Sequence, residues 1–290
     1  MKPLAKFTFD AIGTHWSIET ERPLTPPEKR AITQIISEFD HTYSRFRSDS
    51  LVSRIARGND SAYTFPSSII ELYDIYTRLE QSTDGAVNPL VGQSLERLGY
   101  DAEYSLQPSG DPFIPPSFSS VATLHGTILE LTQPALIDIG AIGKGYLVDQ
   151  IAEIVRQTHQ EFVVDASGDI CVHRTRPEVI GLEDPFDSTR AIGVVRIANL
   201  SLCASATNRR AWGDNLHHVI DARTGLPCTT DTIATWAIAS TTVMADALAT
   251  ALFFAEPQQL LHRFGDFYYV TMKQDGSVSH NITPIGELYS

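Results

Sequence analysis

Asp246 and Thr250 are the side chains whose types and spacing most directly indicate chemistry in this sequence. They lie within residues 243–254, where Val, Met, Ala, Leu and Phe occupy every side of a predicted helix. A helix that is apolar all round is buried, and a buried carboxylate is costly unless another group compensates its charge. Because four positions separate Asp246 from Thr250, both side-chain oxygens point toward the same face of the helix.

Two hard oxygen ligands on one buried face suit a small divalent cation. The alternative role is structural: Asp246 would cap a neighbouring loop, and Thr250 would bond a carbonyl of its own helix. Taken alone, the segment slightly favours the structural role, so the metal site needs support from elsewhere in the chain.

A glycine-rich turn at residues 140–145 precedes another predicted helix and contains Lys144. Glycines let the backbone approach a ligand closely, and the free N–H groups of a helix start suit an anion. Lys144 could then neutralise a phosphate. The spacing matches neither a P-loop nor a dinucleotide-binding fingerprint. A tightly packed turn with a solvated lysine explains the pattern at least as well.

Two polar residues beside turns are weaker candidates. His218 precedes a turn at residues 221–225, which makes it a candidate proton-transfer group, although a lone histidine is more often a structural donor. Asp84 and Gly85 end a predicted helix. Asp84 could accept hydrogen bonds from a ligand, but ordinary helix-end chemistry is the favoured explanation of this pair.

Helices and strands in mixed order must position these residues. Predicted helices begin at Pro27, near Pro66 and after Gly145, and a fourth contains Asp246. Predicted strands cover residues 7–19 (interrupted at Gly13), 127–132, 162–164, 170–172, 192–197, 200–204, 235–240 and 267–272. The last of these is predicted to form a closing hairpin, through the Asp275-Gly276 turn, with the chain from Val278 onward. Without regular βαβ alternation, this order predicts an α+β fold with a mixed, largely antiparallel sheet and flanking helices. No linker composition appears, so residues 1–290 are predicted to form one domain, with a bilobed arrangement as the variant.

Composition excludes several classes of protein. The chain has 290 residues, 42% hydrophobic and 20% charged, with a net charge of −13, so a nucleic-acid surface is not expected. Its three cysteines lack CxxC spacing, which argues against zinc and a disulfide framework and for small buried side chains. No membrane span is expected. Residues 1–7 lack an apolar signal core, so a cytoplasmic location is expected unless a leader has been removed.

Several segments, in order, resemble the ApbE-type FAD:protein FMN transferases from about Gly13 to about Phe254. The matching segments are Gly13-Thr14-His15-Trp16-Ser17-Ile18, residues 44–55, Asp84-Gly85-Ala86-Val87-Asn88-Pro89-Leu90-Val91, Asp138-Ile139-Gly140-Ala141-Ile142-Gly143-Lys144-Gly145, residues 165–170, His218-Val219-Ile220-Asp221-Ala222-Arg223-Thr224-Gly225 and Ala245-Asp246-Ala247-Leu248-Ala249-Thr250. The central glycine-rich segment and the last two contribute most to the resemblance.

The resemblance implies an ApbE-like architecture, related to the T-fold, and a Mg²⁺-dependent transfer of FMN from FAD. The receiving group would be a Thr or Ser hydroxyl of an acceptor flavoprotein, and AMP would leave. Asp246 and Thr250 would be side-chain metal ligands, Ala141 would supply a backbone carbonyl, and His218 would be the candidate base beside the reacting phosphate. The implied FAD contacts are Ile12, Arg45, Phe46, Asp84 and Lys144. With this resemblance, a metal ion becomes the favoured role for Asp246.

The sequence departs from the usual family pattern on the flavin and acceptor sides. Such departures are Ile12 in place of Met, Phe46 in place of Tyr, Asn88 in place of Asp, Ser167 in place of Gly, and Ala206 in place of the Gly of a Ser-Gly pair. They leave the metal ligands untouched but motivate two alternatives. One is hydrolysis of FAD to FMN and AMP by water, and the other is FAD binding without catalysis.

Overall fold

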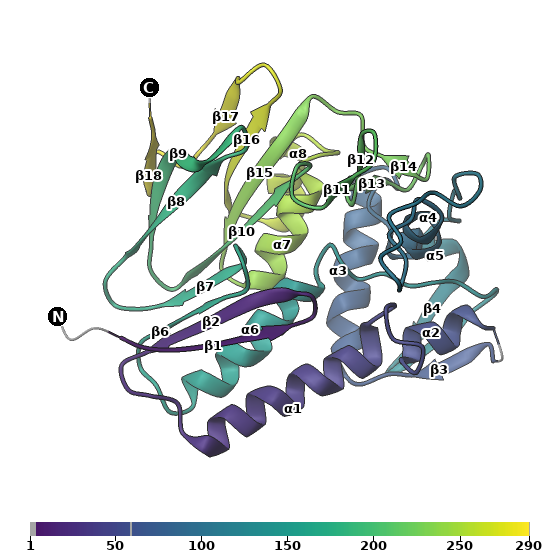
Figure 1. The fold of residues 1–290 in the computed structure, drawn as a ribbon, viewed down its shortest axis with the longest axis horizontal. Helices are drawn as coiled ribbons and strands as arrows, with labels where there is room; N and C mark the ends of the chain where they lie inside the picture. The colour runs from purple at the N-terminus through teal and green to yellow at the C-terminus, as the bar shows by residue number, and fades with distance from the viewer. Residues whose placement is uncertain (1–3, 59, 290) are drawn as a thin grey trace.

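The computed structural model describes residues 4–58 and 60–289, so the first three residues of the N-terminal segment considered above lie outside it. The helices are α1 (Pro26–Tyr43), α2 (Leu51–Ala56), α3 (Ser68–Ser82), the 3₁₀ turn η1 (Pro89–Val91), α4 (Gly92–Arg97), α5 (Phe118–Val121), α6 (Gly143–Arg156), α7 (Thr242–Ala251) and α8 (Pro257–Phe264). Figure 1 shows a sheet-rich part joined to a helix-rich part that contains α2 to α5.

The largest element is an eight-stranded sheet. Its strands, in spatial order, are β1 (Ala5–Ala11), β2 (Thr14–Thr20), β6 (Phe162–Asp165), β7 (Ile170–His173), β10 (Leu200–Ala206), β15 (Thr232–Ala239), β16 (Tyr268–Lys273) and β17 (Val278–His280). All of its pairs among the described residues are antiparallel. The expected α+β class and the closing hairpin, here β16–β17, are confirmed.

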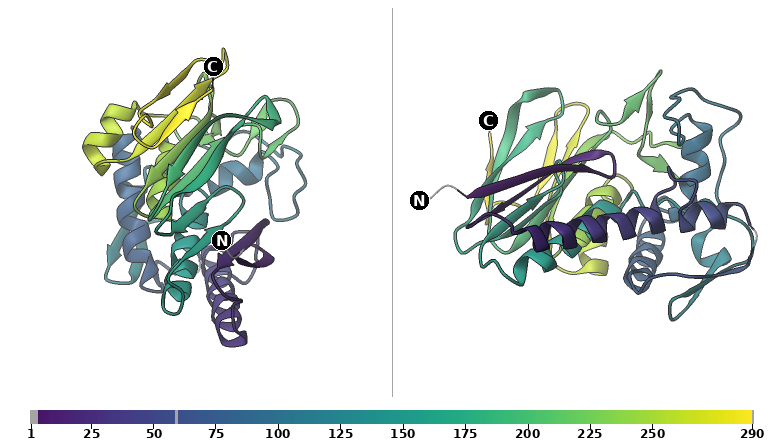
Figure 2. Two further views of the ribbon diagram at one scale, coloured as in Figure 1. Left: turned by 90° about the vertical axis from the view of Figure 1, so that its left-hand side faces the viewer. Right: turned by 60° about the horizontal axis from the view of Figure 1, so that its bottom comes forward.

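The two faces of this sheet are covered differently, because successive side chains of a strand point to opposite faces. Phe162 and Val164 of β6 pack against α1 and α6, whereas Val163 faces the other way. On that other face lies a three-stranded sheet of β18 (Gly286–Leu288), β9 (Asp187–Ile197) and β8 (Glu178–Asp184). Helices therefore cover one face of the large sheet and strands cover the other (Figure 2).

The helix-rich part holds the rest of the core. It contains a small sheet of β3 (Ala62–Thr64), β5 (Ile128–Leu131) and β4 (Ala122–His125). Its apolar side chains merge with those of α3 and α7 in one cluster. The short hairpins β11–β12 (Ala211–Trp212, Leu216–His217) and β13–β14 (Ile220–Asp221, Leu226–Pro227) lie near α4 (Figure 1).

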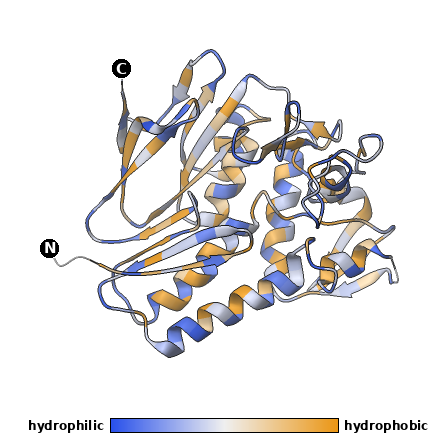
Figure 3. Cartoon of the chain, viewed as in Figure 1, coloured by the Kyte–Doolittle hydropathy of each residue, from blue (hydrophilic) through white to orange (hydrophobic). Residues whose placement is uncertain are grey.

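Local sequence explains where the long helices begin. Thr25 and Glu28 form a capping box at the start of α1, with proline in the first turn. Along α1 hydrophilic and hydrophobic residues alternate, because one face of the helix packs against the core and the other is exposed to solvent (Figure 3). Helix α7 takes its cap from α6: Asp149 Oδ1 and Oδ2 accept the N–H groups of Thr242 and Val243 at 2.9 and 2.8 Å. The start of α7 is thus joined to the middle of α6.

Several elements differ from the expectation. Strand β8 and helix α8 were not predicted; burial alternates in β8 only as far as Leu182, where the register shifts, and α8 has only eight residues. The apolar stripe of the helix predicted from Pro27 continues to Phe46 in the sequence, but α1 ends at Tyr43, because the next residue turns into extended backbone. Residues 218–220 have the pattern of a strand that leads into the predicted turn, but His218 lies in a bend between β12 and β13. Among the helices described, none has the length and apolar character needed to span a membrane.

Candidate functional site

A cavity of about 1060 Å³ opens where the helix-rich part and the glycine-rich turn meet strands β7, β10 and β15 of the large sheet and β8 of the sheet beside it. Of the residues singled out from the sequence, those that line it are Ile12, Arg45, Phe46, Ala141, Lys144, His218, Asp246 and Thr250. They come from five different segments of the chain, so the fold gathers into one place what the sequence separates by more than 200 residues.

Asp84 is the exception. It is exposed at the end of α3 with φ +50°, and it is not among the residues that line the cavity. The backbone there turns through Asp84 and Gly85 to end the helix, and Gly85 N–H donates to Glu80 O at 2.8 Å. The structure places Asn88, four residues later, at the cavity instead.

Asp246 lies on the buried face of α7, with only 7% of its surface exposed. Its Oδ2 accepts the N–H of Gly145 from the first turn of α6 at 2.9 Å. Burial, and next the charge of Asp169, raise the pKa of the Asp246 carboxyl to about 8. Without a compensating cation this group holds a proton at neutral pH, so a positive ion beside it would be bound favourably.

Close contact between α6 and α7 fixes the positions of Asp246 and of the glycine-rich turn. A Cβ at Gly145 would lie 2.4 Å from the carbonyl oxygen of Thr242 and 2.7 Å from Cβ of Asp246. Only glycine permits this approach. Half-buried Thr250, one turn beyond Asp246, and half-buried Ala141, just before α6, also face the cavity.

Lys144 is held by a carboxylate that the sequence analysis did not single out. Its Nζ forms an ion pair with Oδ2 of Asp169, whose side chain is fully buried. Although burial alone would lower it, the charges of Asp169 and Asp246 raise the pKa of Lys144 above its usual range. The other oxygen of Asp169, Oδ1, has no hydrogen-bond partner among the residues described. Lys144 is therefore charged, and Asp169 neutralises its charge.

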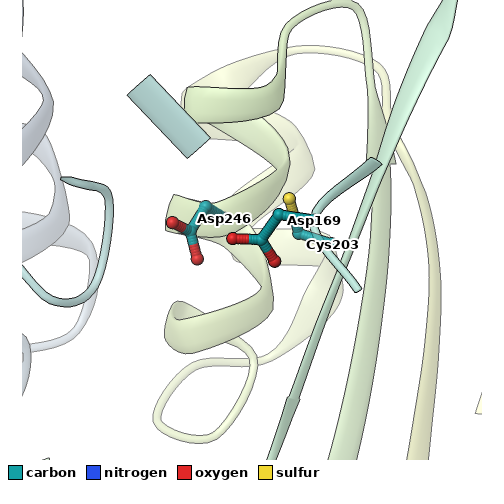
Figure 4. A group of neighbouring side chains, drawn as sticks. All are labelled: Asp169, Cys203 and Asp246. Atoms are coloured by element: carbon teal, nitrogen blue, oxygen red, sulfur yellow. The ribbon is translucent and has the colours of Figure 1, made fainter. Parts of the chain in front are cut away.

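Cys203 lies beside these carboxylates (Figure 4). Ligand atoms of Asp169, Cys203 and Asp246 lie within 4.8 Å of one another. Burial raises the pKa of the Cys203 thiol well above its usual value, so the group stays protonated and packs as a small apolar side chain. All three cysteines are free and buried, as the sequence predicts.

His218 carries an uncharged imidazole in this site. Its backbone N–H donates to Arg210 O at 3.2 Å, and its ring Nδ1 is buried with no partner among the described atoms. Burial, followed by the positive charge of Arg210, lowers the pKa of His218 to about 3. At neutral pH the imidazole carries no charge, so one ring nitrogen has a free lone pair.

Arg45 and Phe46 belong to an aromatic and cationic wall of the cavity. The Arg45 Nε–Asp138 Oδ2 distance is 2.6 Å, and Arg45 NH1 donates to Tyr100 O at 2.7 Å. The ring of Phe46 stacks on Tyr104 with centroids 5.1 Å apart, and the guanidinium of Arg45 lies 4.1 Å from the Phe46 centroid. Asp138, Tyr100 and Tyr104 all line the cavity, and no local signal links them to Arg45 in the sequence.

Ile12 enters the cavity from a strained turn. It joins β1 to β2 with φ +43°, and Gly13 follows with φ +74°. A β-branched residue at positive φ is an outlier, and such strain persists where the surrounding structure holds it in place. Ser167 also adopts positive φ, at +54°, and its hydroxyl donates to His15 O at 2.8 Å.

Comparisons with known proteins agree with this arrangement. The ApbE family model matches residues 12–266. A curated relative from Escherichia coli K12, named "FAD:protein FMN transferase", is 26% identical over 304 residues, covering 94% of this chain and 85% of the relative. A relative of the same name from Haemophilus influenzae is 24% identical over 247 residues, which cover 77% of this chain and 70% of its own.

Solved structures show the same fold. An ApbE protein from Thermotoga maritima superposes with a TM-score of 0.84 at 21% identity, and the match covers 97% of both chains. The flavin transferase ApbE from Vibrio cholerae gives a TM-score of 0.80 at 19% identity, over 97% of this chain and 99% of the other. Since the family model spans most of the sequence and the fold agrees throughout, this chain belongs to the ApbE family.

Proposed function

We propose that the protein is an FAD:protein FMN transferase that moves FMN from FAD to a Ser or Thr hydroxyl of an acceptor protein. One observation carries the proposal: residues from separate ApbE-like segments converge on one cavity. Asp246, Thr250, Ala141, Lys144 and His218 all line it, although they come from α7, the turn before α6, α6 itself and the bend before β13. The curated relatives carry the name of this activity.

The residues that would hold a divalent cation are Asp246, Thr250 and the carbonyl of Ala141. Their oxygens are the hard donors that Mg²⁺ prefers, and the protonated state that burial imposes on Asp246 is relieved by a cation. A bound Mg²⁺ polarises phosphoryl oxygens and offsets their negative charge. The donor chemistry therefore fits the ion that the resemblance implies.

The proposed reaction exchanges the phosphoanhydride bond of FAD for a phosphoester bond to the acceptor. The acceptor hydroxyl oxygen forms a bond to the flavin-side phosphorus of FAD, and the bond from that phosphorus to the oxygen of AMP breaks. His218, neutral at pH 7, takes the hydroxyl proton, and AMP leaves with the electron pair of the broken bond. Lys144 places a positive charge beside the phosphates, while Arg45 and Phe46 form the wall proposed to hold the flavin.

The test is to incubate the protein with FAD, MgCl₂ and purified candidate acceptor flavoproteins, followed by a denaturing gel and a mass spectrum. We expect flavin fluorescence to stay with an acceptor through denaturation, with one AMP released per flavin attached. Release of AMP at the same rate with and without acceptor would instead establish FAD hydrolysis. Tight FAD binding with no AMP release in Mg²⁺ would establish a non-catalytic flavin-binding protein.

A further inference from the structure

Nearly all the positive charge that faces the cavity is already neutralised by carboxylates of the chain. Its cationic lining residues are Arg45, Arg47, Lys144, Arg209 and Arg210. The ion pairs are Arg45–Asp138 at 2.6 Å, Arg47–Asp49 at 2.9 Å, Arg209–Glu183 at 2.5 Å and Lys144–Asp169. Within residues 4–58 and 60–289, the guanidinium of Arg210 has no carboxylate partner. Arg210 is therefore the one cationic lining residue of the described structure that is not in an ion pair.

Arg210 lies next to His218, the proposed base. It stands in the turn between β10 and β11, and its carbonyl accepts the backbone N–H of His218 at 3.2 Å. Its side chain is exposed and lines the cavity. The charge of Arg210 also lowers the pKa of His218, so the guanidinium acts on the proposed base.

The balance of charges in the site indicates the role of Arg210. Lys144 and Asp169 cancel, and an ionised Asp246 leaves one negative charge at the centre of the site. A divalent cation adds two positive charges and the diphosphate of FAD adds two negative ones, which again leaves one negative charge unmatched. An arginine supplies that positive charge and can bind two phosphate oxygens at once.

We infer that Arg210 binds the diphosphate group of the nucleotide substrate. In the described structure it is the only cation of the cavity wall that no carboxylate of the chain neutralises. The inference rests on the proposed function for the identity of that nucleotide. Arg209 next to it has the same side chain but lies against Glu183, at 2.5 and 2.6 Å from its two carboxylate oxygens. The sequence alone does not separate the two arginines, whereas the ion pairs do.

The experiment measures binding of inorganic pyrophosphate to the Mg²⁺-loaded protein by calorimetry, and KM for FAD in the transfer assay. We expect Arg210→Gln to raise both the dissociation constant for pyrophosphate and the KM for FAD by about 10- to 100-fold, the range for one charged hydrogen-bonding partner. Arg210→Lys should recover part of the loss. The control is the double variant Glu183→Gln/Arg209→Gln, which removes the neighbouring guanidinium together with its carboxylate and should change both values by less than about twofold.

Unchanged pyrophosphate affinity in Arg210→Gln would overturn the inference, as would failure of the wild-type protein to bind pyrophosphate. Equal weakening in the double variant would also overturn it, because the effect would then not depend on Arg210 being unpaired. If pyrophosphate binding depends on Arg210 but the wild-type protein releases no AMP from FAD, the diphosphate site stands and the proposed function fails.

Discussion

At the scale of single residues, burial decides the protonation of the groups proposed to act. Asp246 and His218 are shifted in opposite senses, because burial disfavours the charged form of each. At neutral pH the carboxyl of Asp246 keeps its proton, and the imidazole of His218 stays uncharged. Asp246 is thus ready to exchange a proton for a metal ion, and His218 is ready to accept a proton.

Replacing Asp246 by Ala should reduce Mg²⁺-dependent turnover by at least about 100-fold, since a ligand to a cation worth several kcal/mol in the transition state is lost. The fold should persist, because the carboxyl is largely uncharged in the metal-free protein and its removal leaves one N–H, that of Gly145, without a partner. Steady-state kinetics and circular dichroism check both parts. Asp275→Ala, in the exposed turn before β17, is the control. Turnover by Asp246→Ala at the control rate would contradict the metal assignment.

His218→Ala should slow transfer by about 10²–10⁴-fold, the usual contribution of a general base. Affinity for FAD should change much less, because the neutral ring offers no charge to the phosphates. Single-turnover rates and fluorescence titration with FAD separate the two quantities. A parallel loss of rate and affinity would make His218 a binding residue rather than a base.

At the scale of elements, the site depends on how closely α6 packs against α7. Gly145 permits the contact, and Asp149 ties the start of α7 to the middle of α6. A substitution that separates these helices must move Asp246 relative to Ala141, even though neither residue is altered.

Gly145→Ala should therefore destabilise the protein by about 1–3 kcal/mol, the usual range for overpacking a core, and should weaken Mg²⁺ binding. The added Cβ would meet backbone and Cβ atoms of α7 that cannot rotate away. Urea unfolding and Mg²⁺ titration measure the two effects. Gly181→Ala in β8 is the matched control for stability, because its nearest neighbour would be Ala191 Cβ at an ordinary 3.6 Å. Equal stability of the two variants would show that α6 and α7 can move apart freely.

At the scale of the whole molecule, the raised pKa of Asp246 links stability to pH. The folded state holds a proton that the unfolded state releases near pH 4, so this stabilising contribution is complete below that pH and is lost as pH rises through about 8. His218 acts in the opposite sense, but only below about pH 6.5, since its folded pKa lies near 3. Between pH 7 and 9, raised carboxyl pKa values such as that of Asp246 and, nearer pH 9, the raised pKa values of the buried thiols lower stability in the same direction, so the contribution of Asp246 is the difference between the wild type and Asp246→Asn.

We expect the melting temperature of metal-free protein to fall between pH 7 and 9, and MgCl₂ to raise it more at pH 8.5 than at pH 6. Mg²⁺ stabilises by binding the folded state, and at low pH it must displace a proton first. Calorimetry of the wild type and of Asp246→Asn measures this. In the variant the dependence on Mg²⁺ should disappear. A Mg²⁺ effect of equal size at both pH values would argue against Asp246 as the ligand.

The expectation that residues 1–290 form one domain stays a prediction. Strands from both ends of the chain, β1–β2 and β16–β17, belong to the same sheet, and the cluster around α3 and α7 joins the helix-rich part to it. We therefore expect one unfolding transition, with coincident curves from tryptophan fluorescence and circular dichroism. Two separated transitions would show two cooperative units instead.

The sequence by itself determined the features that depend on neighbouring residues. Periodicity and turn chemistry predicted extended chain on both sides of Gly13, the helix fed by the glycine-rich turn, the buried helix with Asp246 and the α+β class, but not that the two halves around Gly13 pair as a hairpin. Local pattern also placed the boundary at Asp84, where helix-end chemistry was the favoured explanation and where the structure indeed ends α3.

Only the tertiary structure decided which charges are free. Arg45 meets Asp138 across 93 positions of the chain and Lys144 meets Asp169 across 25, and no local pattern marks those partners. The same holds for Arg209 and Arg210, which are adjacent and chemically identical in the sequence. Whether a charge is neutralised depends on distances of a few ångströms between remote segments, and folding alone sets those distances.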